Sequence, residues 1–259
     1  MVLSDTSRCA LGRWLRWREA RGPFFMVSTL AVSERLARYL ALGDSYTIGE
    51  SVAPADRWPE VLVTQLRELG LDMARPQIIA RTGWTTDELA TALDAAERGE
   101  SVALTDSETA TAPTPPYALV TLLIGVNDQY RGRPAEHYRQ HLRALLQRSI
   151  AYAGGHAQRV LLLSIPDWGS TPFAQQLGRD AAQVASEIDQ YNALAAQESQ
   201  PLGVVFIDIT ALTRQAVERP ELLAADGLHP SALDYARWAK AALASARTAV
   251  GASTGCESN

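Results

Sequence analysis

The sequence has little that would tie this protein to a disulfide framework, a membrane or nucleic acid. Only two cysteines occur among 259 residues, Cys9 and Cys256, and this spacing is typical of neither a disulfide framework nor a metal site. No apolar run reaches the roughly 18 residues of a membrane span, so we expect no stable membrane insertion. A net charge of -5 argues against nucleic acid as a partner, because phosphate binding needs a concentrated basic face.

Several common site motifs are also absent. No two glycines are spaced as G-x-G, which excludes the dinucleotide-binding fingerprint, and no G-x-x-x-x-G-K phosphate loop occurs. The G-x-S-x-G nucleophile turn of α/β-hydrolases is missing as well. His137 and His141 stand four residues apart, but Tyr138 replaces the glutamate of a zinc-protease helix. We interpret this pair as a solvated helix face and predict no metal site.

The N-terminal segment differs from the rest of the chain. The stretch RCALGRWLRWREARG, residues 8–22, contains five arginines and two tryptophans and lacks the apolar core and cleavage site of a secretory signal. We predict a disordered extension over residues 1–25, one domain over residues 26–250 and a disordered tail over residues 251–259. An amphipathic surface-binding segment is the alternative for the extension. Without a recognisable export signal, we expect a cytoplasmic location.

The remainder alternates short apolar runs with helical patterns. We expect buried strands over residues 38–42, 77–80, 118–124, 159–164 and 204–208. Helical spacing and end signals predict helices over residues 57–70, 85–99, 134–155, 179–197 and 231–250. The second of these opens with Thr85 and Glu88 at the spacing of a capping box. In the last helix, the apolar residues expected roughly on one face are Leu233, Ala236, Leu243, Ala246 and Val250. This alternation is typical of an α/β fold with a parallel sheet covered on both faces. The Thr/Pro-rich residues 100–117 are predicted to form a surface loop.

Polar residues follow the predicted strands. In an open parallel sheet, ligands bind at the carboxyl ends of the strands, so these loops are where chemistry is expected. The first strand ends abruptly in Gly43-Asp44-Ser45, where Ser45 is either a turn residue or a nucleophile held at the sheet edge. The next two loops contribute Gly83, in RTGWTT, and Asn127, in GVNDQY. A lone asparagine in a turn is more often there for local backbone bonding than for catalysis.

An acid and an imidazole precede the last predicted helix. In DGLHP, Asp226 stands three residues before His229, and Gly227 permits a sharp turn between them. The carboxylate can therefore fold back onto the near ring nitrogen and leave the far nitrogen free to act as a base. This pair alone is equally compatible with a structural hydrogen bond and with catalysis.

Taken together, the loops supply a hydroxyl, a glycine N–H, an amide donor and an Asp–His pair, which are the parts that acyl transfer requires. The segments GDSYT, RTGWTT, GVND and DGLHP, in this order, resemble the sequence blocks of the SGNH subgroup of the GDSL hydrolases. Tyr46 stands where the eponymous motif has leucine. The resemblance runs roughly from Tyr39 to Leu243.

The resemblance implies a three-layer α/β/α sandwich with a five-stranded parallel sheet of flavodoxin-like order, and no metal or organic cofactor. It implies hydrolysis of a small-molecule carboxylic ester by Ser45 as nucleophile, His229 as base and Asp226 as orienting acid. The implied oxyanion hole consists of Ser45, Gly83 and Asn127. An acyltransferase, a lysophospholipase and a thioesterase remain alternatives on the same site. A non-catalytic binding protein on this fold is a further alternative, and the oligomeric state stays open.

Overall fold

The computed structural model describes residues 36–254 of the chain. The predicted extension over residues 1–25 and the end of the predicted tail, residues 255–259, lie outside the described residues. The last helix, α9 (Ala232–Thr254), continues past its predicted end at Val250 into the segment for which a disordered tail was predicted. The extent of the domain, residues 26–250, stays a prediction.

A parallel sheet of five strands forms the centre of the fold. The strands are β1 (Tyr39–Gly43), β2 (Gln77–Ala80), β5 (Leu119–Leu123), β6 (Val160–Leu163) and β7 (Val205–Ile207), in the order β2-β1-β5-β6-β7. Every pairing between neighbours is parallel. The bounds of each strand lie within two residues of those predicted from the sequence. The predicted α/β class and flavodoxin-like strand order are confirmed.

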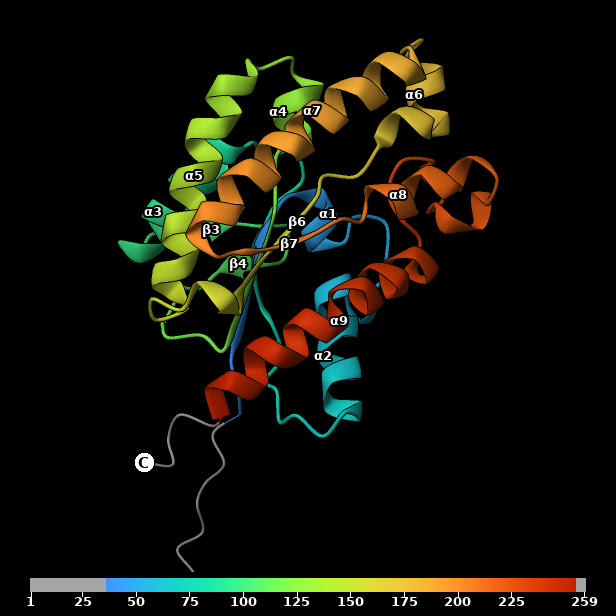
Figure 1. Ribbon diagram of the computed structural model, residues 1–259. Helices are drawn as coiled ribbons and strands as arrows, with labels where there is room; N and C mark the ends of the chain where they lie inside the picture. Colours follow the sequence, from blue (N-terminus) through green and yellow to red (C-terminus); the bar gives the residue numbers. More distant parts are fainter. Residues whose placement is uncertain (1–35, 255–259) are drawn as a thin grey trace, which may run out of the picture. The chain divides into compact units, whose positions relative to one another are not determined.

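Helices cover the sheet on both faces. Figure 1 shows α9 beside α2 (Trp58–Glu68) on one side, and α3 (Thr86–Glu97), α5 (Ala135–Tyr152) and α7 (Ala181–Ser199) on the other. The helix α2 packs on α9, and α5 packs on both α3 and α7. All residues of β1 and β5 are buried, as expected for strands covered on both faces. The shorter elements are α1 (Ser45–Ile48), η1 (Pro54–Asp56), α4 (Val126–Tyr130), η2 (Ala157–Arg159), η3 (Trp168–Ser170), α6 (Pro172–Gln176), η4 (Gln200–Leu202), α8 (Thr210–Thr213), η5 (Arg214–Val217) and η6 (Pro220–Leu222).

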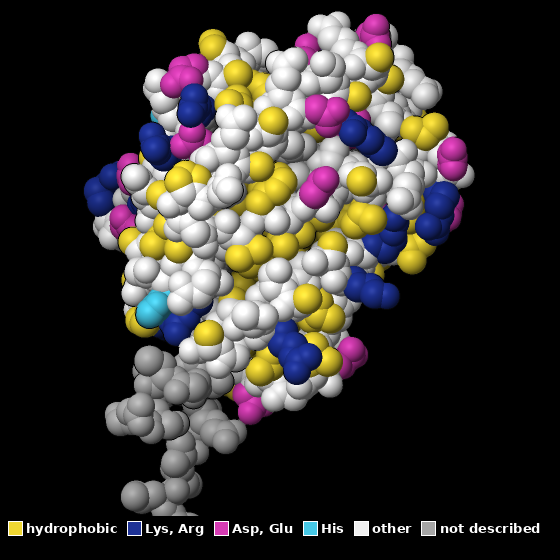
Figure 2. All heavy atoms as spheres, viewed as in Figure 1, with side chains coloured by type: hydrophobic (Ala, Val, Ile, Leu, Met, Phe, Trp, Pro, Cys, Tyr) yellow, Lys and Arg dark blue, Asp and Glu magenta, His cyan; other side chains and the backbone are white. Residues whose placement is uncertain are grey.

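The surface seen in Figure 2 carries basic and acidic side chains that are interspersed, so this face has no concentrated basic patch. Within residues 36–254, no helix combines the length and the apolar character needed to cross a bilayer.

Two local features differ from the sequence-based expectations. The segment predicted as a surface loop contains a short antiparallel hairpin, β3 (Val102–Ala103) with β4 (Thr109–Ala110). On α9, Leu233 was expected on the apolar face but is 48% exposed, whereas Tyr235 and Trp238 are fully buried. By contrast, the predicted capping box of α3 is present, since the Glu88 carboxylate accepts the Thr85 N–H at 2.9 Å.

Gly43 ends β1 directly before the segment that carries Ser45. A Cβ at this position would overlap the Thr47 hydroxyl and the backbone carbonyl of Leu123. We therefore expect Gly43→Ala to lower the free energy of unfolding by about 1–3 kcal/mol, the usual cost of overpacking a rigid interior. Urea denaturation measures this change. The control is Gly251→Ala on α9, where an added Cβ has no atom of the described residues within 4 Å, so stability should not fall. An unchanged Gly43→Ala protein would contradict the crowding argument.

Candidate active site

Ser45 is the first residue of α1 and follows β1 after a single residue, Asp44. Asp44 is the N-cap, and its Oδ1 accepts the Tyr46 N–H at 3.0 Å. Gly49 ends the helix in the left-handed region, at φ 72°. Ser45 is 5% exposed. The nucleophile candidate is therefore fixed at the carboxyl end of a central strand by a short, capped helix.

The carboxyl group of Asp44 is buried beside Ser45. Burial and, to a smaller extent, the nearby Asp128 raise its pKa to about 8, although the N–H bond from Tyr46 lowers it. A carboxyl group with this pKa is mostly protonated at pH 7. Asp44 thus caps α1 while placing little negative charge next to the Ser45 hydroxyl.

Asp226 and His229 are in contact, as the sequence predicted. The Asp226 Oδ2 lies 2.7 Å from the His229 Nδ1, and Oδ1 accepts the N–H groups of Leu228 and His229, each at 2.9 Å. Gly227, at φ 68°, makes the turn between them. Burial raises the Asp226 pKa, but the bonds from Ser51, His229 and the backbone outweigh it and lower the pKa to about 2. The carboxylate is therefore ionised and holds one ring nitrogen of His229.

Ser51 is a contact of Asp226 that sequence reasoning missed. Its hydroxyl donates to Asp226 Oδ2 at 2.6 Å, the same oxygen that faces His229. Among the described residues, Ser51 is the only non-glycine residue at positive φ, 65°. No sequence signal indicated this contact, because the two residues are 175 positions apart.

The aromatic ring of Tyr46 packs against the His229 imidazole. The Tyr46 ring centroid lies 5.2 Å from that of His229 and 6.0 Å from that of Trp238. His229 is 7% exposed. Tyr46 therefore packs against the imidazole. From the sequence, Tyr46 was noted only as a departure from the family motif.

Three hydrogen-bond donors were predicted to form an oxyanion hole. The backbone N–H groups of Ser45 and Gly83 have no acceptor among the described residues, and Gly83 adopts φ 88°. Asn127 lies in the first turn of α4, directly after β5, and its Nδ2 donates to the Trp84 carbonyl at 3.0 Å. An amide has two N–H donors, so this bond fixes the side chain and leaves the second donor available.

Ser45, Asn127 and His229 line one cavity of about 140 Å³. Its other lining residues are mostly apolar or aromatic: Tyr46, Val126, Tyr130, Trp168, Phe173 and Leu228. The Ser45 hydroxyl and the His229 ring are not hydrogen-bonded to each other in this structure. Catalytic bonds of this kind are often long or misaligned and tighten in the substrate complex.

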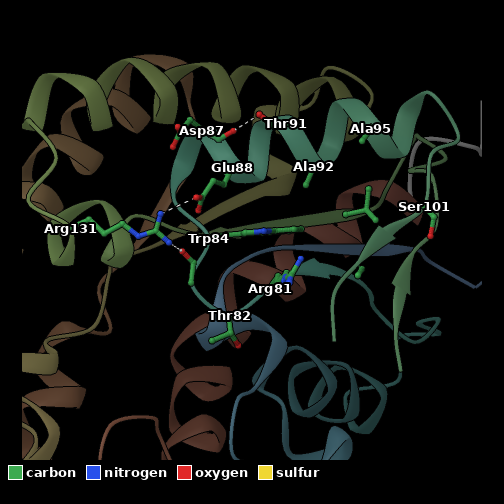
Figure 3. A pocket seen from close by; sticks show the side chains of 13 residues that line it. Arg81, Thr82, Trp84, Asp87, Glu88, Thr91, Ala92, Ala95, Ser101 and Arg131 are labelled. Carbon is green, nitrogen blue, oxygen red and sulfur yellow. Dashed lines mark hydrogen bonds and ion pairs between the residues drawn. The ribbon is translucent and has the colours of Figure 1, made fainter. Parts of the chain in front are cut away.

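Gly83 does not line this cavity but an adjoining groove of about 610 Å³. Figure 3 shows the groove between the loop of Trp84, helix α3 and the segment around Ser101, with Arg131 at one end. Arg131 donates to the Gly83 carbonyl at 2.5 Å and pairs with Glu88 at 2.9 Å (Figure 3). Arg131 therefore holds the Gly83 loop in place, a role that the sequence did not indicate.

Asp87, Asp128 and His137 have ligand atoms within 4.8 Å of one another, which makes them a candidate metal centre. The Arg133 guanidinium already lies among them, 3.1 Å from Asp87 and 3.0 Å from the His137 Nε2. Asp128 accepts the N–H and the hydroxyl of Thr86 at 2.9 and 2.8 Å. Because a cation and local donors satisfy these groups, we infer no metal centre here.

Comparison with known proteins gives the family. The model described as the GDSL-like Lipase/Acylhydrolase family matches residues 41–237. The chain belongs to this family. The resemblance drawn from the four sequence blocks is thus confirmed, and the protein is a GDSL-like hydrolase. No curated protein matches the chain by sequence.

Solved structures of several other proteins share the fold. TesA is 19% identical with a TM-score of 0.57, over 82% of this chain and 99% of that chain. The lipase/acylhydrolase from Enterococcus faecalis is 18% identical with a TM-score of 0.57, over 82% and 96%. Axe2, an acetylxylan esterase from Geobacillus stearothermophilus, is 19% identical with a TM-score of 0.55, over 81% and 94%. At these identities the likeness establishes the fold alone.

Proposed function

We propose that this GDSL-like hydrolase cleaves carboxylic esters of small molecules through an acyl-enzyme formed on Ser45. The observation that carries the proposal is the Asp226–His229 pair, 2.7 Å apart, whose imidazole lines the same cavity as Ser45. A serine, an oriented imidazole and free N–H donors at one sheet edge are the requirements of acyl transfer.

The reaction follows from these positions. His229 takes the proton of the Ser45 hydroxyl as the oxygen attacks the acyl carbon, and it delivers this proton to the leaving alcohol oxygen when the ester C–O bond breaks. Asp226 accepts the Nδ1–H of His229 and stabilises the imidazolium. Water then attacks the acyl-enzyme with His229 again as base, which releases the acid and restores Ser45. The N–H groups of Ser45 and Gly83 and the Asn127 amide hold the oxyanion.

The acyl acceptor and the ester class define the alternatives. An acyltransferase, a lysophospholipase or a thioesterase would use the same residues. Product analysis with a competing alcohol separates an acyltransferase from a hydrolase. A comparison of substrates separates the lysophospholipase and the thioesterase from an esterase. A non-catalytic binding protein would not react with a serine-directed fluorophosphonate, whereas the proposed enzyme is labelled on Ser45.

The size of the cavity sets an expected acyl length. About 140 Å³ is below the roughly 300–1,000 Å³ of a typical small-molecule pocket, so the cavity favours a short acyl chain. Its walls are mainly apolar, which suits a hydrocarbon chain. Across a series of 4-nitrophenyl esters from acetate to decanoate, kcat/KM should be highest for acyl chains of about four carbons or fewer. Phe173→Ala, which enlarges the cavity, should move the optimum to longer chains. An optimum at long chains in the wild type would contradict this assignment.

Asn127→Ala is expected to lower kcat by about 10² to 10³ with little change in KM, because its second amide hydrogen binds charge that exists only in the transition state. Fluorophosphonate labelling should be slower for the same reason. Asn127→Asp should be worse than alanine, since it places a negative charge beside the oxyanion. Loss of the bond to Trp84 should reduce the melting temperature only modestly. A normal kcat with a large loss of stability would assign Asn127 a structural role instead.

A further inference from the structure

Two consecutive residues that follow the helix of the nucleophile, Glu50 and Ser51, contact two other loops of the site. The Glu50 carboxylate accepts a hydrogen bond from the Thr82 hydroxyl, and Thr82 directly precedes Gly83. The Ser51 hydroxyl donates to the Asp226 Oδ2 at 2.6 Å. The Glu50–Ser51 segment therefore connects the loop that carries Ser45 with a loop of the oxyanion hole and with the loop of the orienting acid.

The backbone fixes this segment to α1. The N–H groups of Gly49 and Glu50 both donate to the Ser45 carbonyl, each at 3.0 Å. A displacement of the segment would thus act directly on the residue that carries the nucleophile. The segment that contacts Thr82 and Asp226 is therefore held next to Ser45 by hydrogen bonds to the Ser45 carbonyl.

Ser51 adopts a backbone conformation that does not suit serine. At φ 65° a residue with a Cβ is strained, whereas glycine is not. Glycine would therefore satisfy the turn better than serine does. What serine adds is the hydroxyl, and the structure places it on the oxygen of Asp226 that faces His229.

We propose that Ser51 and Glu50 are positioning residues for ester hydrolysis, Ser51 by orienting the Asp226 carboxylate and Glu50 by holding the Thr82–Gly83 loop. Neither touches the reacting atoms. This inference rests on the proposed function, because it gives the two residues a role only if Asp226 and Gly83 serve the reaction.

Substitutions at Ser51 separate catalysis from stability. Ser51→Gly removes the hydroxyl and relieves the backbone strain, so kcat should fall about tenfold, the low end for a hydrogen bond to a charged group, while the melting temperature does not fall. Ser51→Ala should lose the same activity and be less stable than the glycine variant. Ser51→Thr keeps the hydroxyl but suits positive φ poorly, so it should retain most activity at reduced stability. KM should change little throughout.

Substitutions at Glu50 and Thr82 test the second contact. Thr82→Val and Glu50→Ala should each lower kcat several-fold, and the double variant should be no worse than the poorer single one, because both remove one interaction. Glu50→Gln keeps an acceptor oxygen and should stay close to the wild type. Thr64→Val is the matched control, since the Thr64 hydroxyl bonds only within its own helix, at 3.1 Å to the Glu60 carbonyl.

The outcomes distinguish this inference from the function on which it rests. If Ser51→Gly and Thr82→Val stay within twofold of the wild-type kcat while Ser45→Ala is inactive, the positioning role is wrong and the hydrolase mechanism stands. If Ser45→Ala remains active, the mechanism itself is wrong. A uniform loss of activity in step with melting temperature across the Ser51 variants would make Ser51 a structural residue and overturn the proposal.

Discussion

Ser45→Ala is expected to lower kcat by about 10⁴ to 10⁶ and to abolish labelling by a serine-directed fluorophosphonate. The reason is that the hydroxyl oxygen forms the covalent bond to the acyl group, and no neighbouring group can replace it. The fold should persist, because Ser45 contributes its backbone to α1 and its side chain makes no hydrogen bond among the described residues. Initial rates with a short-chain 4-nitrophenyl ester, together with a thermal melt, measure both quantities.

His229→Ala should cost a similar factor, and the double variant should be little worse than either single one, since these residues act as a unit. Ser107→Ala, an exposed serine at the turn between β3 and β4, is the matched control and should keep the wild-type rate. A Ser45→Ala protein within roughly tenfold of the wild-type kcat would make Ser45 a turn residue.

The fold was predictable because its determinants are local in the sequence. The strand β2 was predicted over residues 77–80 and lies there in the structure, since a short apolar run between turn signals needs no distant information. The capping box at Thr85 and Glu88 is likewise a pattern within four residues. Local patterns did not predict correctly which face of the helix α9 is buried. Leu233 matched the helical spacing of α9 but lies at its exposed start, because tertiary packing selected Tyr235 and Trp238 for burial.

The candidate site was predictable only in part, because only some of its contacts join residues that are close in the sequence. Asp226 and His229 are three positions apart, so their contact follows from one turn. Ser51 reaches Asp226 across 175 positions, and Arg131 reaches Gly83 across 48. These contacts depend on how the loops at the sheet edge approach one another, which residue types and spacing do not specify.

The structure gives Asp226→Asn a specific effect on the tautomer of His229. The Asp226 Oδ1 accepts two backbone N–H groups at 2.9 Å, and an asparagine carbonyl oxygen can keep both bonds. The amide NH₂ then occupies the place of Oδ2 and donates to the His229 Nδ1. The ring must in turn carry its hydrogen on Nε2, where it cannot accept the Ser45 proton. We expect kcat to fall by about 10³ to 10⁴, with slower fluorophosphonate labelling and a retained fold.

We also expect Asp226→Asn to change the free energy of unfolding by an amount that depends on pH. The pKa of Asp226 is lowered to about 2, from about 3.9 for an unfolded aspartate, so the ionised carboxylate stabilises the folded state above about pH 4. This stabilisation is lost as the pH falls through 2. The wild type should therefore be more stable than Asp226→Asn at pH 7, and the difference should close as the pH approaches 2. Urea denaturation at several pH values measures it. A constant difference across this range, or a variant that keeps a tenth of the wild-type kcat, would show that Asp226 is not the ionised partner that orients His229.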